Sequence, residues 1–252
     1  MSSYAKDNQI PRFVRLPFTI YKWIFVAPFL GLTTLVLGLI IIILSFLGAG
    51  NFCSKVLAKA WARINAMVAM MRIEIVGKEH VEPGQSYIIV VNHQSLTDIF
   101  ALYGYLEMDV KWVMKKELRS IPIFGQAASA MGHIIIDRSN TKSALQTINE
   151  AREKVHDGMS VIFFPEGTRS DPGELRIFKK GAFRFALELG LPILPIALHG
   201  SANILPINTI DLMPGKVKLE YCEPISTEGL DITSATEIGN RARESIFEAL
   251  SR

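Results

Sequence analysis

A histidine and an aspartate stand five positions apart, directly after an apolar run that predicts a buried strand. They are His93 and Asp98 in the stretch "IIVVNHQSLTDIF", residues 88–100. An imidazole beside a carboxylate is suited to take a proton from a hydroxyl, because the carboxylate fixes the tautomer of the ring and stabilises its charged form. A structural alternative stays open, in which the aspartate caps a helix and the histidine is a hydrogen-bonded turn residue.

Ser95 lies between these two residues and is the obvious candidate for a nucleophile. The surrounding "NHQSLTD" lacks the sharp strand-to-helix turn and the glycines that expose a nucleophilic serine. Direct attack by a bound alcohol, with His93 as the base, is therefore the simpler mechanism.

A second polar group follows another predicted strand, in "FFPEGTRS", residues 163–170. Its composition predicts an open loop, in which the Arg169 guanidinium is suited to bind phosphate and Glu166 to orient that arginine or accept from a ligand hydroxyl. Arg138 follows a third strand. Each cation alone also fits a solvated surface charge, but together they favour a doubly charged phosphate ligand, and further candidates lie downstream at Arg176, Lys179 and Lys180.

The elements that must position these residues alternate between strand and helix. Short apolar runs predict strands at residues 72–77, 86–91, 110–114, 133–137, 160–164, 193–198 and 216–221. Amphipathic stretches predict helices at residues 97–107, 141–157, 180–189 and 234–251. This alternation predicts an α/β fold, with a mostly parallel or mixed sheet flanked by helices. Ligands gather at the carboxyl ends of such strands, so the three polar groups share one edge if their strands run parallel.

The amino-terminal part is different, since the 32 residues from Trp23 to Ser54 carry no charge. Such a run predicts a membrane segment. Basic residues flank it on both sides, which favours a hairpin that dips into the bilayer and returns over a single crossing. Residues 55–71 predict an interfacial helix, although the same periodicity also fits a helix packed on protein; the expected apolar face holds Leu57, Ala60, Trp61, Ile64, Val68 and Met71.

The composition narrows the function further. The net charge is +3, and residues 111–184 carry 13 Lys and Arg against 8 Asp and Glu. Without a dense basic stripe interleaved with aromatic residues, nucleic acid is not expected as a partner, and an anionic small ligand or membrane surface fits better. The two cysteines, Cys53 and Cys222, suggest neither a disulfide framework nor a metal site.

Four blocks of the sequence resemble those of the glycerolipid acyltransferases, and most closely the bacterial 1-acylglycerol-3-phosphate acyltransferases. The blocks are "NHQSLTD", "GHIIIDR", "FPEGTRS" and "LPILPIALHG", in order between residues 73 and 222. The resemblance implies that His93 is the general base and Asp98 its partner. It also implies a binding site for the acceptor phosphate, formed mainly by Arg138, Glu166, Gly167, Thr168 and Arg169. Lys115 is a weaker candidate for the same site.

The expected activity is transfer of an acyl chain from acyl-CoA or acyl-carrier protein to the sn-2 hydroxyl of 1-acylglycerol-3-phosphate, giving phosphatidic acid, with no cofactor and no metal. Another lysolipid acceptor, a non-catalytic lipid-binding protein and a hydrolase remain alternatives. We expect a membrane-associated helical segment at residues 1–72 and a catalytic domain at residues 73–252. Membrane lipids are expected partners, and the catalytic domain is expected on the cytoplasmic face of the inner membrane.

Overall fold

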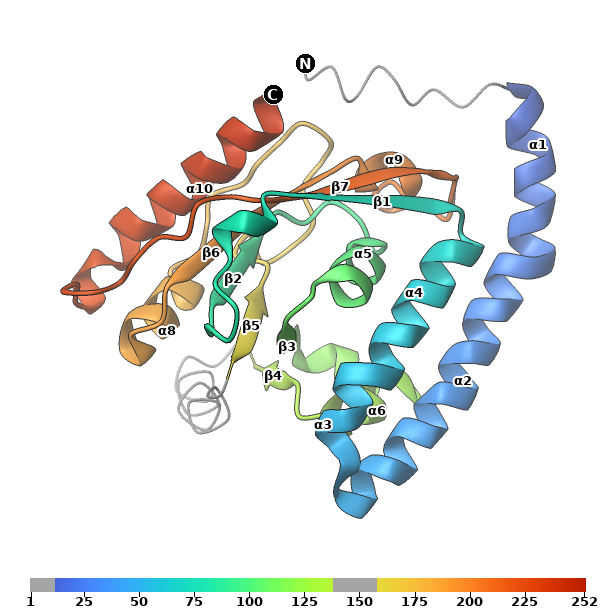
Figure 1. The fold of residues 1–252 in the computed structure, drawn as a ribbon. Helices are drawn as coiled ribbons and strands as arrows, with labels where there is room; N and C mark the ends of the chain where they lie inside the picture. The colour runs from blue at the N-terminus through green and yellow to red at the C-terminus, as the bar shows by residue number, and fades with distance from the viewer. Residues whose placement is uncertain (1–11, 138–157) are drawn as a thin grey trace.

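The computed structural model describes residues 12–137 and 158–252, so the helix predicted at residues 141–157 lies outside the described residues. Figure 1 shows a twisted sheet with helices on both faces and a helical hairpin along one side.

Seven strands of the described residues form one sheet, in the order β1-β7-β6-β2-β5-β3-β4. Neighbouring strands are parallel except β6 and β7, which are antiparallel. The predicted mixed α/β sheet is confirmed, and each strand ends within two residues of its predicted position. The strands are β1 Met71–Val76, β2 Ile88–Val91, β3 Asp109–Lys115, β4 Ile134–Ile136, β5 Met159–Phe163, β6 Ile193–His199 and β7 Gly215–Tyr221.

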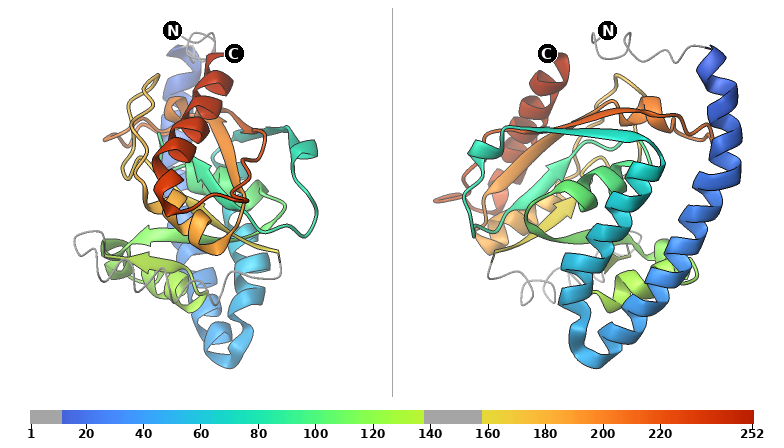
Figure 2. Two further views of the ribbon diagram at one scale, coloured as in Figure 1. Left: turned by 90° about the vertical axis from the view of Figure 1, so that its left-hand side faces the viewer. Right: turned by 45° about the vertical axis from the view of Figure 1, so that its right-hand side comes forward.

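Helices cover both faces of this sheet, as the two views of Figure 2 show. On one face lie α8 (Gly181–Leu189) and α10 (Ala235–Ser251). On the other lie α4 (Lys59–Val68) and α5 (Asp98–Tyr105). Successive residues of β2 alternate between the two apolar cores and all are buried, which explains why its sequence is a continuous apolar run.

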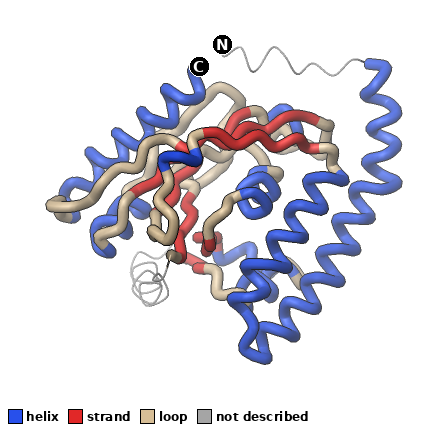
Figure 3. The backbone as a smooth tube through the Cα atoms, viewed as in Figure 1, coloured by secondary structure: helices blue, strands red, loops and turns tan. Residues whose placement is uncertain are grey.

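The first part of the chain folds back on itself as a helical hairpin. Helices α1 (Arg12–Tyr21) and α2 (Ala27–Leu44) descend, and the chain returns through α3 (Gly50–Phe52) and α4. The turn is made at Gly48, whose φ of +90° suits glycine. Short π-helical stretches join these helices, and Figure 3 follows the hairpin as nearly continuous helix. Residues 15–68 are long and apolar enough to cross a membrane by length and composition.

The returning arm of the hairpin packs on the α/β part of the chain. Its fully buried residues are the small ones, Ala58, Ala62 and Ala66, and Trp61 contacts the ring of Phe100 in α5 at 5.3 Å between centroids. Protein covers the alanine ridge, as in the alternative of a helix packed on protein, and the predicted apolar face is largely half-buried. Contact of that face with lipid stays a prediction. Alanines in the seam let two helices approach closely, and Leu57, Trp61 and Val68 of the predicted face also pack against the core.

The other arm is fixed by a close contact between a glycine and a strained isoleucine. A Cβ on Gly38 in α2 would lie 2.3 Å from Cγ2 of Ile123. Ile123 has φ +64° and ψ −54°, a rare backbone conformation for a β-branched residue. It stands just before α6 (Phe124–Ala130), and Phe124 lies beside Trp61. Residues 123 and 124 therefore fill the angle between the two arms.

Candidate active site

Strands β2, β5, β3 and β4 are parallel, so their carboxyl ends lie at one edge of the sheet. His93 follows β2, Glu166 follows β5, and Lys115 is the last residue of β3. The sequence prediction of a shared edge is confirmed for these groups. Arg138 lies outside the described residues, directly after Asp137 at the end of β4.

The predicted pair forms a direct contact. His93 Nδ1 lies 2.7 Å from Asp98 Oδ2, and the Asp98 side chain is fully buried. The same oxygen accepts from the main-chain N–H groups of Gln94 at 2.9 Å and Ser95 at 3.0 Å. Asp98 is also the first residue of α5, where the helix dipole favours a negative charge. The carboxylate thus closes the turn and aligns the imidazole with the same oxygen.

The imidazole ring is held between this carboxylate and an aromatic ring. Phe164 stacks on His93 with centroids 3.9 Å apart and planes 14° from parallel. Since Nδ1 faces Asp98, a proton on Nδ1 leaves the lone pair of Nε2 for another group. The His93 side chain is 17% exposed, so a substrate can reach it from outside.

Glu166 links the two loops of the site. Its Oε1 accepts from His93 N at 2.8 Å, and its Oε2 accepts from Arg176 N at 3.0 Å. The side chain is buried. Ser170 N donates to His93 O at 2.8 Å, which holds the far end of the same loop. In this structure Glu166 positions the main chain, whereas its predicted contact with an acceptor stays a prediction.

Two neighbours of His93 have structural rather than chemical roles. Asn92 donates to Leu198 O at 2.9 Å and accepts from Leu198 N at 2.8 Å, which extends the pairing of β2 with β6. The buried Ser95 hydroxyl donates to Leu205 O at 2.8 Å and lies 2.8 Å from the Thr97 hydroxyl. These contacts agree with the prediction that Ser95 is not a nucleophile.

The predicted phosphate-binding residues lie on the loop after β5. Thr168 is exposed and Arg169 half-exposed, and Gly167 has a left-handed φ of +78°. Within residues 12–137 and 158–252, the Arg169 guanidinium makes no hydrogen bond or ion pair. Lys115 is exposed at the same edge, at the end of β3. Arg169 is thus a half-exposed cation next to Ser170, whose N–H donates to His93 O.

A second imidazole–carboxylate pair ends β6, but burial disqualifies it as a base. His199 Nε2 lies 3.1 Å from Glu220 Oε2, and the His199 side chain is only 3% exposed. Burial lowers the pKa of His199 to about 4. His133, also buried, has its pKa lowered to about 3 for the same reason. Accessibility distinguishes His93 from His199 and His133. The exposed pair of His80 with Glu223 differs in another way, because its carboxylate is open to solvent whereas Asp98 is fully buried.

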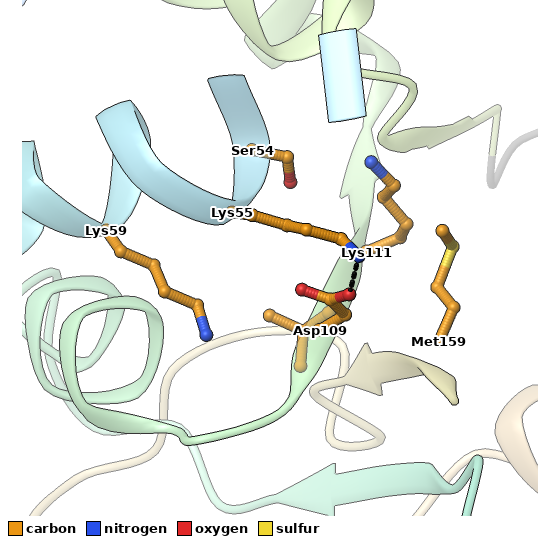
Figure 4. A pocket seen from close by; sticks show the side chains of 7 residues that line it. Ser54, Lys55, Lys59, Asp109, Lys111 and Met159 are labelled. Atoms are coloured by element: carbon orange, nitrogen blue, oxygen red, sulfur yellow. Dashed lines mark ion pairs between the residues drawn. The ribbon is translucent and has the colours of Figure 1, made fainter. Parts of the chain in front are cut away.

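A hollow elsewhere in the molecule does not belong to this site. Figure 4 shows it where the hairpin meets the amino ends of β3 and β5, opposite the edge of His93. Its volume is about 10 Å³, room for roughly one water molecule. Lys55 pairs there with Asp109, and Lys59 donates to two main-chain carbonyls. The lysines at this hollow hold the hairpin to the sheet.

Sequence reasoning missed Phe164, Asn92 and the main-chain role of Glu166. Phe164 had a signal, an aromatic residue at the carboxyl end of a buried strand. The loop contacts had none, since His93 and Glu166 are 73 positions apart.

The parallel edge, the buried carboxylate and the accessible imidazole define an α/β protein equipped for proton transfer. Residues 72–199, half of the 252, match the family model described as Acyltransferase, and the chain belongs to this family.

Among its relatives is the chloroplastic 1-acyl-sn-glycerol-3-phosphate acyltransferase BAT2 of Brassica napus, 35% identical over 77% of this chain and 55% of that protein. The 1-acyl-sn-glycerol-3-phosphate acyltransferase of Pseudomonas aeruginosa is 33% identical over 76% of this chain and 75% of that protein. The chain spans about half the length of several of the curated relatives it matches.

A solved structure is also similar. The crystal structure of the 1-acyl-sn-glycerophosphate acyltransferase PlsC from Thermotoga maritima superposes with a TM-score of 0.74 at 26% identity, covering 94% of each chain. The likeness therefore includes the helical hairpin as well as the sheet.

Proposed function

We propose that this protein transfers an acyl chain from a thioester to the sn-2 hydroxyl of 1-acylglycerol-3-phosphate and so forms phosphatidic acid. The observation that carries the proposal is the 2.7 Å contact between His93 Nδ1 and Asp98 Oδ2 beside the loop of Arg169. The names of the relatives, which specify this acceptor, support the choice of substrate. The proposed donors are acyl-CoA and acyl-carrier protein.

In the proposed reaction His93 Nε2 takes the proton from the acceptor hydroxyl as its oxygen attacks the thioester carbonyl carbon. The new C–O bond forms, the C–S bond breaks, and the proton passes from the imidazolium to the thiolate. Asp98 stabilises the imidazolium between these steps, and Phe164 keeps the ring from rotating. No serine ester is formed, in keeping with the occupied hydroxyl of Ser95.

The acceptor phosphate is proposed to bind at the loop after β5. Arg169 offers a bidentate fork, Thr168 a hydroxyl, and Gly167 a turn without a side chain. Lys115 and Arg138 are assigned to the same site by the edge on which their strands end.

The hairpin is proposed to hold the catalytic part at the cytoplasmic face of the inner membrane. Both a lysolipid and its diacyl product reside in the bilayer, so an anchored site meets them without extracting them. The large exposed apolar side chains along residues 13–70 support this role, among them Phe46 at 92% exposure in the hairpin turn.

A thiol-release assay tests the proposal most directly. Full-length protein is given acyl-CoA with 1-acylglycerol-3-phosphate, with lysophosphatidylglycerol, or with no acceptor. We expect release that depends on 1-acylglycerol-3-phosphate and matches the phosphatidic acid formed. Release without an acceptor indicates a hydrolase, preference for the other lipid indicates a different acceptor, and no release with either acyl-CoA or acyl-carrier protein indicates a non-catalytic protein.

A further inference from the structure

The side chain of Lys179 lies against the turn at Gly167. The two residues are far enough apart in the sequence that this contact could not be predicted from it. A Cβ on Gly167 would stand 2.8 Å from Lys179 Nζ, 3.0 Å from Cε and 3.3 Å from Cδ. The end of the lysine side chain therefore lies against the main chain of the loop that carries Arg169. The φ of +78° favours glycine there, and the end of the lysine lies in the space that a side chain would take.

Hydrogen bonds and packing fix the main chain of Lys179 and of the residues before it. Lys179 N donates to Pro165 O at 2.9 Å, and the preceding Phe178 is buried in the core. Arg243 adds two hydrogen bonds to the same segment, from Nη2 to Leu175 O at 2.6 Å and from Nε to Arg176 O at 3.1 Å. The backbone that presents Lys179 is thus fixed on both sides.

Several donors around this turn have no hydrogen-bond or ion-pair partner among the described residues. They are the N–H groups of Thr168 and Arg169, the Arg169 guanidinium and the ammonium of Lys179. Two main-chain N–H groups and two cations around one turn suit a compact anion of high charge.

We infer that Lys179 binds the phosphate of the acceptor together with Arg169, and that it selects a phosphate monoester over a diester or an uncharged glycerol. The inference rests on the proposed function and adds a residue and a selection rule to it. A monoester carries up to two charges at neutral pH and a diester one, so a second fixed cation favours the monoester.

The neighbouring cations are distinguished from Lys179 by position. Arg176 contributes its main-chain N–H to Glu166, and its side chain is exposed. Lys180 precedes the first turn of α8, and the three atoms nearest to a Cβ on Gly167 all belong to Lys179. Lys180→Met is therefore a matched control, which removes the same charge one residue away.

The experiment compares the wild type with Lys179→Met, Lys179→Arg and Lys180→Met on 1-acylglycerol-3-phosphate, lysophosphatidylglycerol and 1-acylglycerol. We expect Lys179→Met to raise KM for the monoester by about ten- to a hundredfold, as for loss of a charge-assisted hydrogen bond, with kcat nearly unchanged. Its KM for 1-acylglycerol should not move, and arginine should restore most of the loss. Equal effects of the two methionine variants, or a kcat loss alike for all acceptors, would overturn the assignment.

A second measurement needs neither turnover nor a variant. Acetylation of the wild type is followed at Lys179 and Lys180 by mass spectrometry, in micelles of 1-acylglycerol-3-phosphate or of 1-acylglycerol. Protection of Lys179 alone, and only by the phosphorylated lipid, supports the assignment. Equal labelling of Lys179 in both micelles would refute its assignment to the phosphate site, whichever acceptor the protein uses. If Lys179 is protected but the transfer assay fails, only the proposed function is refuted.

Discussion

The helical hairpin and the edge of the sheet that carries His93, the proposed catalytic edge, are held in place by different balances of forces. The hairpin is fixed largely by close apolar packing, with Gly38 against Ile123 and Ala62 buried in the seam, and Lys55 and Lys59 add polar contacts. The catalytic edge is fixed by two buried carboxylates, Asp98 and Glu166, which accept five hydrogen bonds, four of them from main-chain N–H groups.

This difference matches how precisely the side chains of each region must be positioned. Apolar packing resists separation but has little directionality, which suits an arm that meets fluid lipid. Hydrogen bonds to a carboxylate are short and directional, and they fix the imidazole within the narrow range that proton transfer requires. Five experiments, ordered from the largest expected effect to the smallest, separate the two regions.

His93→Ala removes the proposed base and should lower kcat by about 100- to 10,000-fold while leaving the unfolding midpoint and membrane binding unchanged. His80→Ala is the control, because His80 follows β1, whose carboxyl end lies at the opposite edge. Rates are measured by thiol release. Near-normal transfer by His93→Ala would show that His93 is not the base and that this edge of the sheet is not the catalytic one.

Phe46→Asp with Leu47→Asp should release the protein from vesicles, because each charge opposes insertion by about 3 kcal/mol. Both residues lie exposed in the hairpin turn. Binding is measured by vesicle sedimentation, with Phe247→Asp on the exposed face of α10 as the control. Equal losses of vesicle binding for the control and the hairpin variant would show that the hairpin turn is not the membrane anchor.

Glu166→Gln keeps the size of the side chain but replaces one acceptor oxygen with a donor. One of the N–H groups of His93 and Arg176 then loses its acceptor, which should lower the free energy of unfolding by about 1–3 kcal/mol and reduce kcat. Glu174→Gln, on the exposed part of the same loop, should change neither. Chemical denaturation and thiol release provide the two measurements. A fully stable and active Glu166→Gln protein would contradict the carboxylate-based account of this edge.

Gly38→Ala should lower the free energy of unfolding by about 1–3 kcal/mol, because the new methyl group overlaps Ile123. Gly31→Ala in the same helix has no atom within 4 Å of its Cβ and should be neutral or slightly stabilising. Thermal unfolding in detergent, read by circular dichroism, compares the two. If both variants behave alike, the glycine–isoleucine contact does not fix the hairpin.

Acidification should destabilise both regions through their buried histidines. The pKa of His199 is lowered to about 4 and that of His133 to about 3, whereas the unfolded chain has the ordinary value near 6.5. As the pH falls from 6.5 to 4, only the unfolded state takes up these protons, so stability falls, by at most about 1.4 kcal/mol per pH unit for each histidine.

The variants His133→Gln and His199→Gln measure how much each region contributes to this acid sensitivity. His133 contacts Tyr103 near the hairpin, and His199 is the last residue of β6 in the sheet. Each variant should flatten the dependence of unfolding free energy on pH, measured by denaturation between pH 7 and 4.5. Unchanged slopes in both would show that other groups control the response.

Much of the fold was readable because local patterns encode it. Predicted runs of five or six residues located each strand to within two residues, and Gly190, left-handed at the end of α8, ends the helix predicted at residues 180–189. The five-residue spacing of His93 and Asp98 was readable for the same reason, since strand, turn and first helical turn are consecutive. The alanine ridge of residues 55–71, which is buried most completely, was not predicted, because small residues pack without a periodic signal of size.

The sequence by itself determined the elements, the base with its carboxylate, and the uncharged run that becomes the hairpin. Tertiary structure alone decided the strand order, the antiparallel placement of β7, the stacking of Phe164 on His93 and the approach of Lys179 to Gly167. The physical reason is one of range. Side-chain periodicity reports which face of an element is buried, but contacts across many residues depend on how whole elements pack, and that packing leaves no mark on a single segment.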